Sequence, residues 1–143
     1  RSPDSFVQFD TSHLPDGVYF TRLTAVETAP RPDGERLTTT FETDDLTIDH
    51  TAPEIIEASA RRAGDRLVIG VRGRDGLSLI DGIEVVFNNG VREHTEQPQD
   101  GIRDGREETF LLDVPYERVA GATSVEVTLY DAAGNAAARR LSW

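Results

Sequence analysis

The sequence contains no cysteine, no methionine and no lysine. The lack of cysteine excludes disulfides, thiolate metal sites and thiol nucleophiles. Because all fifteen basic residues are arginine, the chain also cannot form a lysine Schiff base or a lysine–asparagine isopeptide crosslink. The lysine contact of a phosphate-binding P-loop is excluded for the same reason.

The 26 acidic residues outnumber the 15 basic ones, and the net charge is -11 at pH 7. Nucleic acids and anionic membrane surfaces both require a basic face on their partner, so we expect neither as a ligand. No apolar run approaches the roughly 20 residues needed to cross a bilayer, so we predict no membrane insertion. The first residues, RSPDSF, resemble neither an initiator nor a signal peptide, which predicts that the chain is processed or cut from something longer.

Helical patterning is almost missing, because no window of about a dozen residues keeps apolar residues at i, i+3, i+4 and i+7. Short alternating runs bounded by Gly, Pro, Asp and Asn predict an antiparallel β-sandwich instead. The predicted strands are 6–10, 18–28, 39–48, 54–60, 66–72, 80–87, 91–96, 108–114, 124–131 and 137–141.

The clearest local signal is Asn89-Gly90, between the strands 80–87 and 91–96. Asn-Gly adopts the two positive φ angles of a tight hairpin turn without steric cost, so these strands should pair directly. Residues 98–107, PQDGIRDGRE, have little apolar content and predict a long surface loop.

The chain resembles itself at a distance of about one immunoglobulin-like domain. A shift of 104 residues places Gly17 on Gly121, Leu23 on Val127, Ala25 on Leu129, Glu27 on Asp131 and Ala29 on Ala133. We therefore predict an all-β fold of tandem immunoglobulin-like β-sandwiches. Residues 1–49 supply about three strands of an incomplete first sandwich, 50–53 form a linker, and 54–143 supply about seven strands of a complete second one.

Three strands with one apolar face cannot close a two-sheet core. The missing strands of the first sandwich must therefore come from another chain, from a segment upstream in the same protein, or from a second copy of this chain.

Several motifs resemble those of bacterial immunoglobulin-like or fibronectin type III-like repeats. They are LPDGVYFTRLTAVETA, FETDDLTIDHTAPEI and the loop YDAAGN, with Glu27 and His50 where such repeats usually have Asp and Asn. The Pro-rich loop APRPDGERL resembles C-terminal modules of secreted bacterial proteins that also contain β-propellers. The resemblance implies a non-catalytic spacer or assembly module of a larger secreted or cell-surface protein, located outside the cell, on its surface or in the periplasm.

Ion binding is the sharpest chemical hypothesis that the residues allow. In an immunoglobulin-like sandwich, the start of the first strand lies at the same pole as the loops after the second and sixth strands. This topology would gather Asp49, Asp75, Asp131 and Asn135, which offer the oxygen ligands that calcium prefers. The favoured interpretation is that each residue simply forms a turn, with no cofactor. Calcium, which would rigidify the joint, is the alternative.

Catalysis has few candidate residues in this sequence. General-base chemistry at neutral pH favours histidine, and the three histidines are His13 before a turn, His50 in the linker and His94 on a hairpin strand. No Gly-x-Ser-x-Gly elbow is present. We therefore predict that the chain is not an enzyme and has no catalytic residues.

A binding module is the alternative to a spacer, with carbohydrate or protein as its ligand. Sugar platforms need exposed aromatic rings, and most aromatic residues here fall at alternating strand positions that suit a core. Tyr116 is expected to be a corner tyrosine before the sixth strand. Trp143 is terminal, and it either packs on the last strand or continues into a following domain.

Overall fold

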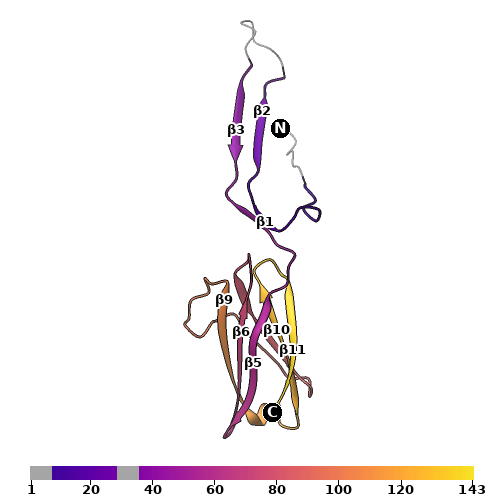
Figure 1. Cartoon of the computed structure of the whole chain (residues 1–143), viewed down its shortest axis with the longest axis vertical. Coiled ribbons are helices and arrows are strands. Elements are labelled where there is room, and N and C mark those ends of the chain that lie inside the picture. The colour runs from indigo at the N-terminus through magenta and orange to yellow at the C-terminus, as the bar shows by residue number, and fades with distance from the viewer. Residues whose placement is uncertain (1–7, 29–35) are drawn as a thin grey trace, which may run out of the picture. The chain divides into compact units, whose positions relative to one another are not determined.

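The computed structural model describes residues 8–28 and 36–143, and the chain divides into two compact units, Arg1–Ile48 and Asp49–Trp143. The elements of the described residues are eleven strands and one short 3₁₀ helix (Figure 1). The predicted all-β fold class is therefore confirmed for this part of the chain.

The first unit consists of two antiparallel strand pairs. β1 (Gly17–Tyr19) pairs with β4 (Leu46–Ile48), and β2 (Arg22–Val26) pairs with β3 (Thr38–Glu42). The predicted strands 18–28 and 39–48 are each interrupted, so both expectations are corrected.

The interruption has a local cause at Thr21 and Thr43. The Thr43 hydroxyl accepts a hydrogen bond from the Thr21 amide at 2.9 Å, and the Thr43 amide donates to the Thr21 carbonyl at 2.9 Å. The Thr21 amide thus donates to the Thr43 side chain instead of to a backbone carbonyl of the facing strand. Of the predicted strand 6–10, residues 8–10 are not in a strand, and residues 6 and 7 lie outside the described residues. The predicted Pro-rich loop lies mostly outside them too.

The strand pair β2–β3 has one polar and one apolar face. Cross-strand neighbours alternate between faces, and Arg22 pairs with Glu42 through a 2.6 Å ion pair on one of them. Leu23 lies opposite Phe41 on the other face. Leu23 is 61% exposed and Phe41 is 66% exposed, so this apolar face covers no core in the described residues.

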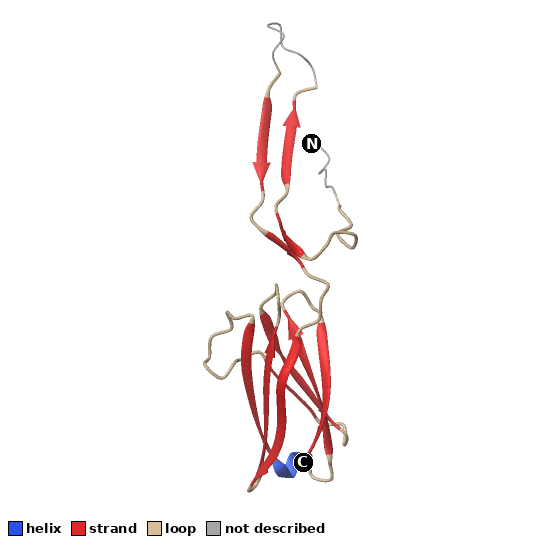
Figure 2. Ribbon diagram, viewed as in Figure 1, coloured by secondary structure: helices blue, strands red, loops and turns tan. Residues whose placement is uncertain are grey.

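The second unit contains two sheets (Figure 2). The three-stranded sheet has the order β5-β6-β9, and the four-stranded sheet has the order β11-β10-β7-β8. The bounds are β5 Glu54–Ala63, β6 Arg66–Arg74, β7 Ile80–Phe87, β8 Arg92–Thr95, β9 Glu107–Pro115, β10 Ser124–Asp131, β11 Ala136–Ser142 and the 3₁₀ helix η1 Tyr116–Val119.

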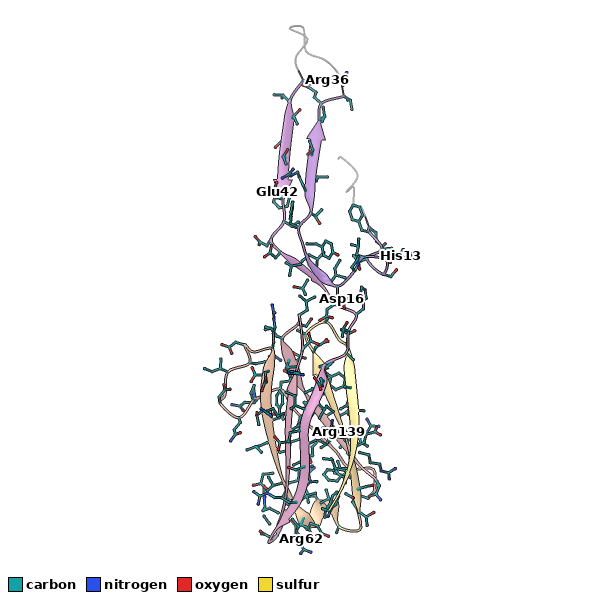
Figure 3. The ribbon with its side chains drawn as sticks, in the orientation of Figure 1. His13, Asp16, Arg36, Glu42, Arg62 and Arg139 are labelled. Carbon is teal, nitrogen blue, oxygen red and sulfur yellow. The ribbon has the colours of Figure 1, made fainter. Side chains whose placement is uncertain are left out.

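The core of the second unit lies between these sheets. Strands β6 and β10 alternate between buried and less buried side chains, as expected when one face of each strand packs on a core. The largest fully buried side chains come from both sheets and from η1: Phe87, Phe110, Leu67, Ile69, Ile80, Leu129, Val71, Val85, Val119, Val125, Val127 and Asp131. At one edge, the Arg139 Nη2 atom of β11 donates to the Ile55 carbonyl of β5 at 2.6 Å (Figure 3).

The hairpin β7–β8 forms as predicted, but its turn is of a different type. Within this turn only Gly90 has a positive φ, 89°, which matches a type I turn followed by a glycine bulge rather than a turn with two left-handed residues. The two asparagine side chains account for the difference. Asn88 Oδ1 accepts from the Thr123 amide at 3.0 Å, and Asn89 Oδ1 accepts from the Val91 amide at 3.2 Å. The predicted surface loop 98–107 corresponds to the segment between β8 and β9.

Candidate metal centre

Three aspartates from separate segments of the second unit lie close together. Asp49 precedes β5, Asp75 follows β6 and Asp131 ends β10. Each offers a carboxylate oxygen, and the three oxygens lie within 4.8 Å of one another. The structure therefore brings together three of the four residues that the sequence analysis proposed as calcium ligands. We call these residues the aspartate trio.

Each member of the aspartate trio also forms a turn of its own backbone through Oδ1. Asp49 Oδ1 accepts from the Thr51 amide at 3.0 Å, and Asp75 Oδ1 accepts from the Leu77 and Ser78 amides at 2.7 Å each. Asp131 Oδ1 accepts from the amides of residues 133 and 135 at 2.9 Å each. The turn-forming interpretation is thus correct for one oxygen of each carboxylate.

The second oxygens of the trio have different surroundings. Asp49 Oδ2 accepts a hydrogen bond from the Ser78 hydroxyl, and Asp131 Oδ2 accepts from Asn135 Nδ2 at 2.9 Å. Asp75 Oδ2 is buried and has no hydrogen-bond partner among the described residues. A buried polar atom without a partner carries the full cost of its desolvation, on the order of 1–3 kcal/mol and more for a charged group.

Asn135, the fourth predicted residue, lies beside the trio as a hydrogen-bond donor. Its Nδ2 atom donates both to Asp131 Oδ2 and to the Asp49 carbonyl at 3.1 Å. The amide group therefore connects the loop after β10 to the segment before β5. In this arrangement Asn135 positions two of the three acids, and its nitrogen rather than its oxygen faces them.

Negative charge at the trio is concentrated and shielded from water. Asp49, Asp75 and Asp131 are 7%, 9% and 2% exposed. Two full charges about 4.8 Å apart repel each other by roughly 3 kcal/mol at an effective dielectric constant of about 20. Burying charges that lack a partner of opposite sign adds a further cost.

The nearby arginines are engaged elsewhere. Arg72 pairs with Glu107 at 3.2 Å, Arg74 pairs with Glu54 at 2.7 Å, and Arg106 Nη1 donates to the Gly76 carbonyl at 3.3 Å. Within residues 8–28 and 36–143, no arginine therefore pairs with a member of the trio.

Ser78 is a member of the site that sequence reasoning missed. Its hydroxyl donates to Asp49 Oδ2 and its amide donates to Asp75 Oδ1, so one residue holds two of the acids. The available signal was its place in the loop between β6 and β7, three residues after Asp75.

The three histidines considered for catalysis are not members of the trio, although His50 directly follows Asp49 in the sequence. His13, His50 and His94 are exposed and come from three different segments. His13 Nε2 lies 3.9 Å from Asp10 Oδ2 (Figure 3).

A shallow groove is lined by residues of β7 and β8 and by Tyr130. In it the Tyr130 hydroxyl donates to Glu84 Oε2 at 3.3 Å. Burial, together with the charge of Glu84, raises the pKa of Tyr130 above its usual 10.0.

Trp143 and Tyr116 both pack on the protein itself. Trp143 is half-buried and packs against the core, where its ring contacts Phe87 of β7. Tyr116 begins η1, and its amide donates to the Asp65 carbonyl at 2.8 Å. The guanidinium carbon of Arg62 lies 3.9 Å from the centre of the Tyr116 ring, within cation–π range (Figure 3).

No helix in the described part of the chain is long and apolar enough to cross a membrane. Comparisons with models of known protein families, with curated proteins and with solved structures found no significant match. The geometry of this chain is therefore the basis for the functional conclusions that follow.

Proposed function

We propose that this chain is a non-catalytic spacer or assembly module of a larger secreted or cell-surface bacterial protein. Its first unit would be completed by strands from another chain or from another part of the same protein.

The topology of the second unit supports an immunoglobulin-like or fibronectin type III-like module. In chain order, β5, β6 and β9 correspond to strands A, B and E, and β7, β10 and β11 correspond to C, F and G. The short strand β8 joins β7, as strand C′ does in variable-type domains. Such modules commonly connect or position other parts of extracellular proteins, which favours the spacer over an enzyme.

The observation that carries the assembly proposal is the exposed apolar face of β2–β3. Shifted by 104 residues, Leu23 falls on Val127 and Ala25 falls on Leu129. Val127 and Leu129 are fully buried in the second unit, whereas Leu23 is 61% exposed. The residues that this shift pairs are therefore buried in the core of the second unit, whereas Leu23 of the first unit is exposed.

The missing cover corresponds to the three-stranded sheet β5-β6-β9, which packs over the face of β10 that carries Val127 and Leu129. The edge of β2 is a second incomplete feature. β10 has a neighbour on each side, β7 and β11, whereas β2 has the single neighbour β3 among the described strands. An unpaired edge next to an apolar face is the arrangement that accepts an added strand. Strand addition would satisfy the edge, and a second sheet packed on the apolar face would bury Leu23 and Phe41.

Hydrogen exchange on two samples tests this proposal. In the isolated chain, the β2 and β3 amides should exchange within the fastest class, while those of β6 and β10 stay protected. In the natural protein, the β2 and β3 amides should become protected, and intact-mass analysis should identify any second polypeptide that copurifies. A well-folded, monodisperse monomer of the isolated chain with strongly protected β2 and β3 amides would rule the proposal out.

A matched pair of substitutions tests whether the apolar face of β2–β3 is the surface that partner strands cover. Leu23→Ser should abolish the protection that the natural protein confers, because it removes an apolar side chain from the face to be covered. Leu111→Ser makes the same change at a residue of β9 that is 48% exposed, and it should leave that protection unchanged.

A further inference from the structure

We propose that the aspartate trio, Asp49, Asp75 and Asp131, is a calcium site of the second unit. This inference is independent of the assembly proposal, because every residue in it belongs to residues 49–143. The Oδ2 atom of Asp75 is the ligand that the protein leaves open for the ion, and Ser78 and Asn135 hold the neighbouring carboxylates in place.

The unpaired oxygen of Asp75 is evidence that goes beyond the clustering of acids. Two side-chain atoms of the described residues are buried without a hydrogen-bond partner, Asp75 Oδ2 and Glu93 Oε1. Glu93 Oε1 lies 2.7 Å from Arg118 Nη2, so a cation compensates it. Asp75 is 9% exposed, and its Oδ2 atom has no such partner in the described structure. A bound cation would supply the missing interaction.

Turn formation does not explain why Asp75 Oδ2 is buried without a hydrogen-bond partner in the described part of the chain. Each turn needs a single acceptor, which Oδ1 provides, and asparagine serves as well as aspartate in that role. Three aspartates at one place add three charges that the turns do not require. The chain does use asparagine at residue 135, where the side chain donates to its neighbours.

The geometry of the trio fits calcium. Two oxygens that bind one calcium ion at about 2.3–2.6 Å can lie up to about 5 Å apart, and the trio oxygens lie within 4.8 Å of one another. Calcium accepts carboxylates in one- or two-oxygen modes and completes six to eight ligands with carbonyls and water. Zinc favours cysteine and histidine ligands, and the trio contains neither. Magnesium keeps several of its waters, which suits a buried set of three carboxylates less well.

Thermal unfolding and isothermal titration calorimetry of the full chain test the site. In calcium about 100-fold above the dissociation constant, the folding equilibrium shifts about 100-fold relative to EDTA. For a unit of this size, that shift raises the melting temperature by on the order of 10 °C. Magnesium at the same concentration should produce a clearly smaller shift.

Asp75→Asn is the decisive variant because it keeps the turn acceptor and removes the charge. In EDTA its melting temperature should equal or exceed that of the unsubstituted chain, since the repulsion within the trio is reduced. In calcium, its melting temperature should not rise. Asp100→Asn is the matched control, because Asp100 Oδ1 accepts from the Ile102 amide at 3.0 Å in the same kind of turn, outside the trio. The control should keep the full calcium response.

Three results would overturn the proposal: no calcium response of the unsubstituted chain at millimolar concentration, an unchanged response of Asp75→Asn, or an equal response to magnesium. If Asp75→Asn does not fold, calorimetric titration of the unsubstituted chain with calcium decides the matter. Heat of binding with one ion per chain supports the site, and its absence refutes it.

Discussion

Trp143 packs edge-on against Phe87, with ring centroids 6.1 Å apart and ring planes at 79°. This contact connects the end of the chain to β7, in the middle of the four-stranded sheet. Trp143 is the single tryptophan of the sequence, so its fluorescence reports the packing of the second unit. Edge-to-face pairs of this kind add about 0.5–1.5 kcal/mol beyond the area that they bury.

Trp143→Ala should lower the unfolding free energy of the second unit by about 1–3 kcal/mol, because it removes a half-buried ring and its contact with Phe87. Denaturant unfolding followed by circular dichroism measures the change. Trp143→Phe should recover part of it. If neither substitution has an effect, the ring does not pack on the core, and a screen of soluble glycans would become informative for this residue.

Phe110→Ala and Phe41→Ala should differ strongly in their effect on stability. Phe110 is fully buried, and its loss should cost about 3–5 kcal/mol of unfolding free energy. Phe41 is 66% exposed, so its loss should cost about 0.5 kcal/mol or less. Chemical denaturation of both variants, followed by circular dichroism, measures this. A large cost for Phe41→Ala would show that the first unit already buries its apolar face.

Gly73→Ala should destabilise the second unit by about 1–3 kcal/mol, because a β-carbon at this position would lie 2.2 Å from Leu129 Cδ2. Leu129 is fully buried and cannot move aside without disturbing the core. Gly70→Ala on the same strand is the control, since its closest contact would be 3.4 Å. Equal stability of the two variants in thermal unfolding would contradict the close approach of β6 to β10.

Tyr130 should ionise at higher pH than an ordinary tyrosine, because burial and then the charge of Glu84 raise its pKa above 10.0. The unfolded chain loses this proton first, so the contribution of Tyr130 to stability is present below pH 10.0 and is lost as pH rises through the pKa of the folded state. The difference in tyrosinate absorbance between the unsubstituted chain and Tyr130→Phe isolates this group. Glu84→Gln should shift the titration toward lower pH; a shift toward higher pH would exclude Glu84 as a cause.

The gathering of the aspartate trio could be predicted because it depends on topology. Once residues 49, 75 and 131 are placed at the starts and ends of their strands, the order of the sheets brings them to one pole. The short-range pattern also predicted the β7–β8 pairing, since Gly90 provides the positive φ that the hairpin needs.

Features that depend on contacts between distant side chains could not be predicted. The turn type at Asn88 depends on a hydrogen bond to the amide of Thr123, which is 35 residues away. The break between β1 and β2 depends on the Thr43 hydroxyl. Ser78 belongs to the site because the conformation of the β6–β7 loop brings its hydroxyl to Asp49. The alternation of apolar residues along the strands does not predict the conformation of that loop.

The polar and apolar faces of β2–β3 also have a consequence for how the protein is made. Among the described residues, the pair combines an unpaired edge with exposed Leu23 and Phe41, two features that promote aggregation between chains. Thr24, Thr40 and the Arg22–Glu42 pair keep only the opposite face soluble. If partner strands complete the first unit as we propose, they would also protect the strand pair from aggregation from the time of its synthesis onward.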